Sequence, residues 1–265
     1  MTKLGFIGCG NMASAIIGGI VSKGLVSPHG IYVSNHSAAS AARAADRLGV
    51  NAGTDNLAVV AAADIVFLSV KPQKYEEVIA QIRDSLRPAQ IVVTIAPGKT
   101  LAWLAERLGP EVKVVRTMPN TPALVGEGFT SYCANAQVTA EELDVVVGLL
   151  ESYGVALQLE ERLIDAASAV GGSAPAFVYA FIEALADGGV AEGLPRAQAY
   201  QVAAQTVLGS AKMVLDTGKH PGQLKDEVCS PAGSTIKGME VLEKAGFRGE
   251  VIDAVRTTAA AARGL

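Results

Sequence analysis

The feature that most constrains the fold lies at the start of the chain, where the apolar segment Leu4–Ile7 leads into the turn Gly8-x-Gly10-x-x-Ala13. Gly8 permits a tight turn, Gly10 lets the backbone approach a pyrophosphate, and Ala13 is small enough to pack a helix against a sheet. Glycines serve geometry alone in many strand–turn–helix units. Here a strand precedes the turn, a helix follows it and a second strand comes on schedule, so the sequence predicts a dinucleotide site at the helix N-terminus.

Composition limits the class of partner. The chain has 265 residues, half of them apolar, which predicts two domains because one core seldom extends much beyond ~250 residues. The net charge of -4, with acidic and basic residues well mixed, gives no basic stripe for nucleic acid or an anionic membrane, so we expect a small-molecule partner. The three cysteines, Cys9, Cys133 and Cys229, form no Cys-x-x-Cys pair, which indicates a reducing compartment. The three histidines, His29, His36 and His220, lie far apart in the sequence, so we expect no metal site.

The sequence shows no targeting segment or membrane span. No basic and apolar leader precedes the first strand, so we expect a cytoplasmic protein. The uncharged run 166–182 is interrupted by Gly171, Gly172 and Pro175 and falls short of the ~20 apolar residues that span a bilayer. We interpret this run as a buried loop and helix.

Strand-like and helix-like segments alternate as far as Leu159. The alternation predicts an α/β domain over residues 1–160 with a Rossmann-type, doubly wound, mostly parallel sheet. The expected helices include one that begins near Ala38 and one that opens with a capping box at Thr139–Glu142, and we expect Asp55-Asn56 to be a turn. The expected strands are 4–7, 31–33, a short piece near residue 50, 64–70, 91–95, 112–116, 128–133 and 155–159. The segment 117–122 carries two prolines and is interpreted as a rigid loop, either a wall for a polar ligand or a connector.

The residues after the second strand bear on the choice of cofactor. In an NAD site an acidic residue here would accept hydrogen bonds from the ribose 2′-hydroxyl, and none is present. Ser34 and Asn35 offer small donors, and His36 and Arg43 supply positive charge, which favours NADPH over NADH. The alternative is that Ser34 and Asn35 cap the helix near Ala38, and the two interpretations are compatible.

Two further segments at the carboxyl edge of the sheet are candidate cofactor walls. Val70, Lys71 and Pro72 would border the adenine side or the ribose, although Lys71 is equally consistent with a solvated surface charge. Ala96 and Pro97 would lie near the nicotinamide ring, where small residues let the ring lie flat. The alternative for the second pair is an ordinary strand-to-helix turn.

Beyond Glu161 the segments take on a helical period. We expect one helix over 175–187, ended by Gly188-Gly189, and another from Arg196 to Gly218 with a wide, alanine-rich apolar face. About a hundred residues of such helices have little to bury them alone. Residues 161–265 are therefore expected to form an all-helical domain that packs against a second copy, the alternative being a bundle packed on the sheet domain.

The most specific stretch of the chain is the run from His220 to Ile236. Within it, Ser230 to Thr235 is expected to form a rigid turn that leads into a helix. The N–H groups of Gly233, Ser234 and Thr235 would form a cup for a carboxylate, and a hydroxyl there could donate a proton. The plainer alternative is that Ser230 or Ser234 caps the helix.

Together with four other motifs, this run closely resembles the pyrroline-5-carboxylate reductase family over essentially the whole chain; those motifs are 6–13, 70–72, 118–122 and 184–190. The resemblance implies an oxidoreductase that reduces 1-pyrroline-5-carboxylate to L-proline with NADPH or NADH, the last step of proline synthesis. It also implies a homodimer with interlocked helical domains, often assembled further into a decamer.

The resemblance also implies residue roles. The substrate carboxylate would sit at Ser230, Gly233, Ser234 and Thr235, with the Thr235 hydroxyl as the catalytic group near the ring nitrogen. Glu227 stands where many members carry Asn, and His36 where several carry Arg or Pro. The cofactor residues would be Gly8, Cys9, Gly10, Asn11, Met12, Ser34, Asn35, His36, Asn56, Val70, Lys71, Pro72, Ala96 and Pro97.

Two rival functions fit parts of this pattern. A β-hydroxyacid dehydrogenase shares the glycine turn and a helical second domain, but it would need Lys212 or Lys225 as its catalytic lysine. The second alternative is a catalytically silent NADPH-binding module that senses redox state or regulates a partner. Such a module would bind NADPH yet reduce neither an imine nor a keto acid.

Overall fold

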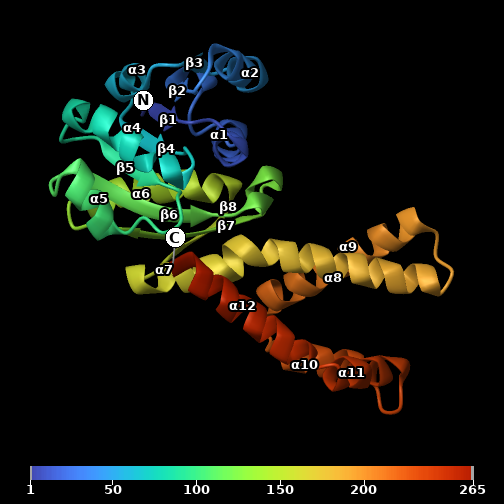
Figure 1. The fold of residues 1–265 in the computed structure, drawn as a ribbon. Coiled ribbons are helices and arrows are strands. Elements are labelled where there is room, and N and C mark those ends of the chain that lie inside the picture. Colours follow the sequence, from blue (N-terminus) through green and yellow to red (C-terminus); the bar gives the residue numbers. More distant parts are fainter. Residues whose placement is uncertain (1, 264–265) are drawn as a thin grey trace. The chain divides into compact units, whose positions relative to one another are not determined.

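The computed structural model describes residues 2–263, which divide into two compact units (Figure 1). The first unit comprises the residues up to Ser173 together with those from Thr258 onward, and the second comprises Ala174–Thr257.

The first unit is built on one eight-stranded sheet with the strand order β3-β2-β1-β4-β5-β6-β7-β8. Neighbouring strands are parallel except for β6 and β7, which are antiparallel. This arrangement confirms the predicted doubly wound, mostly parallel sheet. The strands are β1 (Leu4–Ile7), β2 (Ile31–Ser34), β3 (Asn51–Gly53), β4 (Ile65–Leu68), β5 (Ile91–Thr94), β6 (Lys113–Pro119), β7 (Gly128–Ala134) and β8 (Gly154–Gln158).

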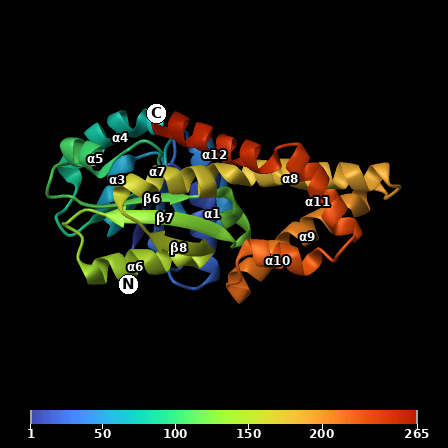
Figure 2. The same ribbon diagram turned by 90° about the horizontal axis from the view of Figure 1, so that it is seen from below.

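Helices cover both faces of this sheet, as Figure 2 shows from a second direction. One hydrophobic cluster joins the sheet to α1, α2 and α6, and a second joins it to α3, α4 and α5. Strands β1 and β4 are buried throughout because they lie between the two clusters, which explains their continuous apolar sequences. The helices are α1 (Asn11–Ser22), α2 (Ala38–Leu48), α3 (Asn56–Ala62), α4 (Tyr75–Ile82), α5 (Leu101–Leu108), α6 (Ala140–Leu150) and α7 (Glu161–Ala167).

Local signals marked several helix ends correctly. The capping box at Thr139 and Glu142 opens α6 with both reciprocal hydrogen bonds present. Gly49 ends α2 in the left-handed conformation at φ 69°. The cap of α2 is Ser37, whose side chain accepts from the Ser40 N–H, so the alternative in which Ser34 and Asn35 cap this helix is wrong.

Two predictions in the first unit require correction. Asp55-Asn56 is more than a turn, because the Asp55 carboxylate accepts the Leu57 N–H at 2.8 Å and thereby caps α3, a helix that the sequence analysis did not predict. The predicted loop 117–122 also begins too early. Residues up to Pro119 belong to β6, since they pair with β7, and only then does the 3-10 helix Thr121–Val125 follow. Pairing with a later strand is a tertiary effect that a local sequence pattern does not show.

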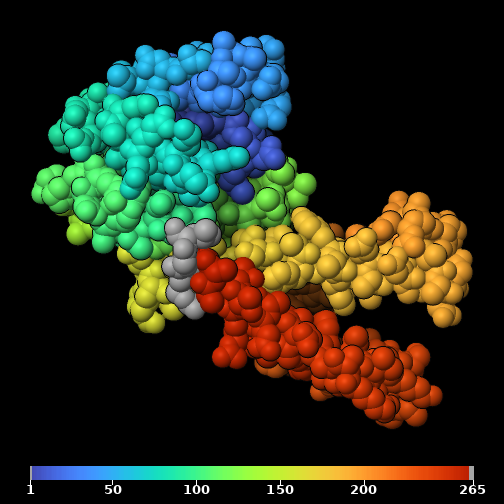
Figure 3. Space-filling view, in the orientation of Figure 1, coloured from blue at the N-terminus to red at the C-terminus, as the bar shows by residue number. Residues whose placement is uncertain are grey.

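The second unit is entirely helical. Its helices are α8 (Ala174–Ala191), α9 (Arg196–Thr217), α10 (Pro221–Val228), α11 (Ser234–Lys244) and α12 (Phe247–Arg263), whose last residues belong to the first unit. Helices α8 and α9 pack through a small alanine cluster of Ala186, Ala199 and Ala203. In Figure 3 the α8–α9 pair and the segment α10–α12 form two arms with open space between them.

The predicted end of α8 at Gly188-Gly189 is wrong, because the helix continues to Ala191. A Cβ on Gly189 would lie 3.1 Å from Leu194 Cδ1 and 3.6 Å from the Ala199 Cβ. Glycine at this position therefore lets the start of α9 approach closely. The chain turns instead at Gly193, where φ is +98°.

The run 166–182, expected as a buried loop and helix, is neither a loop nor largely buried. Helix α7, a π-helical turn at Ser168–Ser173 and α8 form one continuous helix, Glu161–Ala191. Gly171 lies in that turn against the Phe129 ring, where a Cβ would come within 2.6 Å of Cδ1. By length and composition this helix could cross a membrane, yet the core helix of a soluble assembly passes the same test. Only 11% of the most apolar 18-residue stretch of this helix is buried within the chain. Its apolar side chains must therefore be shielded from water by something other than this chain.

Candidate active site

The glycine turn has the geometry that its sequence predicts. Gly8 has φ +89°, and a Cβ there would lie 3.0 Å from the Ser69 carbonyl oxygen and 2.9 Å from Val70 Cγ1. The space that a Cβ would take at Gly10 is empty to 4 Å, which leaves the backbone open to a ligand. Ala13, in the first turn of α1, is buried in the hydrophobic cluster between this helix and the sheet. The turn can therefore present the first N–H groups of α1, including those of Asn11 and Met12, to a phosphate.

Asn35 braces this turn. Its Oδ1 accepts the Cys9 N–H at 2.9 Å, and its Nδ2 donates to the Ser40 carbonyl at 3.1 Å at the start of α2. Burial raises the pKa of the Cys9 thiol, which therefore stays protonated at neutral pH. The amide side chain thus fixes the path of the backbone on which the cofactor would rest.

Ser34 and Asn56 are tied to each other. Ser34 is 1% exposed, and its hydroxyl donates to Asn56 Oδ1 at 2.7 Å, while Asn56 Nδ2 donates to Gln81 Oε1 at 2.8 Å. The Ser34 hydroxyl is therefore engaged inside the protein. His36, two residues after the end of β2, is exposed.

A cavity of about 520 Å³ lies between the glycine turn and α2. Arg47 in this lining donates to Ser14 Oγ, and Ser14 in turn donates to the Gly10 carbonyl at 2.8 Å. Arg47 is not among the residues predicted from the sequence, although its spacing of four from Arg43 places both cations on one side of α2. The full lining is Cys9, Gly10, Asn11, Ser40, Arg43, Ala44, Asp46 and Arg47.

The other expected cofactor walls lie where β4 and β5 end. Lys71 is exposed, Val70 and Pro72 are half-buried, and the Ser69 hydroxyl just before them donates to the Gly8 carbonyl at 3.0 Å. This hydrogen bond joins the end of β4 to the glycine turn. At the end of β5, Ala96 is buried and Pro97 is half-buried.

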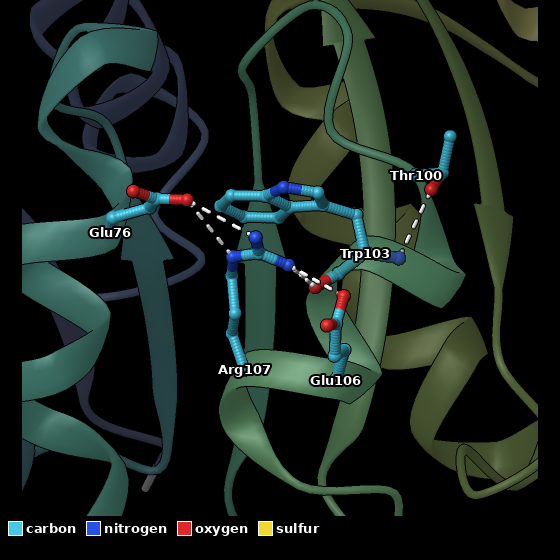
Figure 4. A network of polar contacts seen from close by, with 5 residues as sticks. All are labelled: Glu76, Thr100, Trp103, Glu106 and Arg107. Carbon is cyan, nitrogen blue, oxygen red and sulfur yellow. Dashed lines mark hydrogen bonds and ion pairs between the residues drawn. The ribbon is translucent and has the colours of Figure 1, made fainter.

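The loop that follows Pro97 is held by a network around Trp103 (Figure 4). Thr100 Oγ1 accepts the Trp103 N–H at 3.1 Å and caps α5. The Trp103 ring has Lys99 Nζ 4.4 Å and Arg107 Cζ 4.1 Å from its centroid. Arg107 also reaches Glu76 on α4 at 3.2 Å, so the network ties the loop and α5 to α4.

The turn Ser230–Thr235, in the second unit, is present as expected. Its backbone is strained at Ala232, a non-glycine residue with φ 58°, and the Gly233 N–H donates to the Ser230 carbonyl at 3.0 Å. Gly233 is the N-cap of α11, and no side chain caps this helix, so the alternative in which Ser230 or Ser234 caps it is wrong. The N–H groups of Ser234 and Thr235 are therefore open to an anion, and both side chains are exposed within this chain.

The helix α10, just before this turn, was not predicted. His220 caps it by accepting the Gly222 N–H at 3.0 Å on Nδ1, and Pro221 occupies the first helical position. Glu227 on α10 forms an ion pair with Lys219 at 2.8 Å, and this contact lowers the pKa of its carboxyl.

The lysines that a β-hydroxyacid dehydrogenase would require are both engaged. Lys212 lies 2.6 Å from Asp216 on α9, and Lys225 lies 2.8 Å from Asp226 on α10. The hydrogen bond that Lys225 donates to the Asp226 carboxylate raises the pKa of Lys225, so this lysine remains charged. Among residues 2–263, no group of three or more histidine, cysteine or acidic side chains is placed to hold a metal ion.

Comparison with known proteins identifies the family. Residues 161–265 match the family model "Pyrroline-5-carboxylate reductase dimerisation", and residues 3–98 match "NADP oxidoreductase coenzyme F420-dependent". Pyrroline-5-carboxylate reductase of Escherichia coli K12 is 49% identical over 253 residues, which cover 96% of this chain and 94% of the relative. The chain belongs to the pyrroline-5-carboxylate reductase family. The resemblance stated from the sequence is thereby confirmed.

Other relatives agree with this assignment. The pyrroline-5-carboxylate reductase of Arabidopsis thaliana is 42% identical over 263 residues, covering 99% of this chain and 95% of the relative. The crystal structure of Plasmodium falciparum pyrroline carboxylate reductase with NADP bound has a TM-score of 0.91 at 33% identity, covering 99% of this chain and 97% of that one. Prephenate dehydrogenase from Aquifex aeolicus, at 16% identity and a TM-score of 0.56, shares the fold alone. The family assignment removes the β-hydroxyacid dehydrogenase alternative.

Proposed function

We propose that this chain reduces 1-pyrroline-5-carboxylate to L-proline by hydride transfer from NADPH, with NADH as a second hydride donor, in the final step of proline biosynthesis. The observation that carries this proposal is the 49% identity to a pyrroline-5-carboxylate reductase over nearly the whole chain. The NADP-bound Plasmodium falciparum relative, which has the same fold, supports the choice of cofactor.

The cofactor site proposed for the first unit has three parts. The pyrophosphate would rest on the turn from Gly8 to Met12, where the backbone is open and the N-terminus of α1 favours negative charge. The 2′-phosphate would be bound by His36 together with the cations of the cavity beside α2, Arg43 and Arg47. The remaining cofactor walls would be Val70, Lys71, Pro72, Ala96 and Pro97.

The substrate site proposed for the second unit is the turn that precedes α11. The carboxylate of the cyclic imine would accept hydrogen bonds from the open N–H groups of Ser234 and Thr235, with Gly233 and Ser230 beside them; the Gly233 N–H is already bound to the Ser230 carbonyl. A fixed carboxylate orients the imine carbon for attack, which is the main contribution that positioning makes to a bimolecular step.

NADPH, when bound, supplies the hydride. The Thr235 hydroxyl would donate a hydrogen bond or a proton to the ring nitrogen, directly or through a water that it orients. The imine can also arrive protonated, so no strong acid is required. Catalysis would then consist mainly of positioning and of electrostatic stabilisation at the ring nitrogen.

The match of residues 161–265 to the family's dimerisation model indicates a homodimer. Assembly into a decamer, a cytoplasmic location and the absence of nucleic-acid and membrane partners remain parts of this proposal. The exposed apolar face of the helix Glu161–Ala191 supports this homodimer, because a second copy of the chain would bury that face. We also retain residues 1–160 as the dinucleotide-binding domain and 161–265 as the helical substrate and dimerisation domain.

The test is loss of reduced-nicotinamide absorbance when the purified protein receives 1-pyrroline-5-carboxylate, run in parallel with NADPH, with NADH and with a panel of β-keto acids. We expect rapid oxidation that depends on the imine and is faster with NADPH. Binding of NADPH without oxidation on any substrate would indicate the silent binding module instead.

A further inference from the structure

Tyr75, the first residue of α4, is buried at the junction of two strand ends. Its side chain is 0% exposed and belongs to the hydrophobic cluster that also contains Leu68 and Ala96. No sequence pattern marks this residue as special. Burial raises the pKa of its hydroxyl well above the ordinary value, so this group is a neutral donor and acceptor throughout the working pH range.

The hydroxyl of Tyr75 joins β4 to β5. It donates to the Leu68 carbonyl at 2.5 Å and accepts the Ile95 N–H at 3.4 Å. Leu68 is the last residue of β4 and pairs in register with Thr94, the last residue of β5. In a regular parallel ladder with this register, the Ile95 N–H would donate to the Leu68 carbonyl directly. The Tyr75 hydroxyl therefore replaces the next inter-strand hydrogen bond, the one from the Ile95 N–H to the Leu68 carbonyl. It sets the distance between β4 and β5 at the point where both strands end.

The two segments that follow the ends of β4 and β5 are the proposed cofactor walls. Val70, Lys71 and Pro72 follow Leu68, and Ala96 and Pro97 follow Ile95. A shift of Ile95 relative to Leu68 therefore changes the distance between these two segments. Tyr75 itself is fully buried and is not placed to touch the cofactor, so any effect on catalysis must act through these segments.

We propose that Tyr75 is a positioning residue for the cofactor: its hydroxyl, bound between the Leu68 carbonyl and the Ile95 N–H, fixes the distance between Val70–Pro72 and Ala96–Pro97. The inference rests on the proposed assignment of these segments to NADPH. Because displacement of reacting groups by one ångström can cost about a hundredfold in rate, a displacement of a few tenths corresponds to an effect of about three- to tenfold.

The test compares Tyr75→Phe with Tyr153→Phe. The first variant keeps the ring and lets the Ile95 N–H close onto the Leu68 carbonyl. The second removes a hydroxyl from an equally buried tyrosine in the cluster on the other face of the sheet, where it contacts neither wall. We expect Tyr75→Phe to raise the KM and the Kd for NADPH about three- to tenfold and to lower kcat, with the KM for 1-pyrroline-5-carboxylate changed less than about twofold. The control should leave the KM and Kd for NADPH at wild-type values.

Two results overturn the proposal: an unchanged affinity for NADPH in Tyr75→Phe, or equal losses in the two variants, which would show a general effect of removing a buried hydroxyl. A wild-type protein that binds NADPH but reduces no imine would contradict the proposed function and leave the binding comparison for Tyr75 intact. If Tyr75→Phe does not fold, the test is hydrogen exchange of the Ile95 amide in the wild-type protein. Protection of the Ile95 amide equal to that within β5 supports the bridge, and exchange as fast as in exposed loops contradicts it.

Discussion

Arg116 Nη1 donates to Glu161 Oε1 at 3.0 Å, and this contact joins the middle of β6 to the first residue of the helix Glu161–Ala191. Arg116 Nη2 also donates to Asp165 at 2.8 Å, one turn further along that helix. The arginine side chain is 1% exposed, while the two carboxylates are about one third exposed. Glu161 Oε1 also accepts the Leu101 N–H at 2.6 Å at the start of α5. One buried cation therefore holds three elements of the first unit together.

Arg116→Met should destabilise the protein strongly, because it removes the cation and leaves two carboxylates without their partner. Truncating one member of a buried ion pair costs about 3–5 kcal/mol, and the partial exposure of the carboxylates places the expected loss in the free energy of unfolding at about 3 kcal/mol. Urea denaturation measures this loss. Arg116→Lys, which keeps the charge but cannot bind both carboxylates in a fork, should lose less. A loss below ~1 kcal/mol in the methionine variant would show that the cluster is not important for stability.

Thr235→Ala should lower kcat by roughly ten- to a thousandfold, the range for loss of a hydrogen-bond donor or general acid at the reacting group. The melting temperature should not change, because the Thr235 side chain is exposed within this chain. Thr235→Ser retains the hydroxyl and should recover most of the activity. An unaltered turnover in the alanine variant would remove Thr235 from the mechanism.

Arg47→Gln should weaken NADPH more than NADH, because the arginine lies in the cavity beside the glycine turn and a 2′-phosphate offers it a second negative group. We expect the KM for NADPH to rise about fivefold or more, corresponding to loss of roughly 1 kcal/mol of a charge-assisted contact. The matched control is Arg83→Gln, an exposed arginine next to α4 and outside this cavity. Equal effects on both cofactors would assign Arg47 to the shared pyrophosphate; no effect on either would contradict a role in binding.

Charge placed on the apolar face of α8 should break the dimer. Val178 and Leu185 lie seven residues apart on one face of α8 and are 39% and 40% exposed within the chain. The double variant Val178→Asp/Leu185→Asp should elute as a monomer in size-exclusion chromatography with light scattering. Leu25→Asp changes a leucine that is 49% exposed in the first unit, and it should leave the mass unchanged. A double variant that keeps the wild-type mass would place the dimer contact elsewhere.

Glu142 should contribute stability that depends on pH. Lys113 and the Thr139 N–H both bind its carboxylate and lower its pKa in the folded protein. A depressed folded pKa means that the contribution is complete above the unfolded value of about 4.3 and is lost as the pH falls through the folded pKa. The free energy of unfolding of Glu142→Gln should therefore lie below that of the wild type at pH 7, by roughly 0.5 kcal/mol for a half-buried pair at the surface, and the two should converge as the pH falls through the folded pKa. A constant difference across this range would exclude ionisation as its source.

Much of the fold followed from local signals that act within a few residues. The glycine turn, the capping box at Thr139 and the left-handed Gly49 each have a conformation that their residue types specify. Strands buried on both faces, such as β4, have continuous apolar sequences for the same reason. The family resemblance then supplied what no local rule contains, the chemistry of the turn Ser230–Thr235.

The missed features depend on contacts between distant residues. Pairing with β7 extends β6 through Pro119, and packing against Phe129 and Leu194 explains why Gly171 and Gly189 interrupt no helix. The exposure of the helix Glu161–Ala191 could not be inferred from its apolar composition, since composition does not say what covers it. Arg47 was overlooked although it lies four residues after Arg43, because an arginine on a helix is usually a solvated charge. Tyr75 was overlooked because its local sequence does not show that the side chain is buried between two strand ends.

The central claim is that the chain transfers a hydride from NADPH to the imine carbon of 1-pyrroline-5-carboxylate. The most direct measurement uses NADPH deuterated at C4, with each of the two stereoisomers in a separate reaction, and mass spectrometry of the proline formed. The account predicts L-proline that carries one deuterium at C5 with one stereoisomer of the cofactor and none with the other. Proline without deuterium in both reactions, or no proline despite bound NADPH, would contradict it.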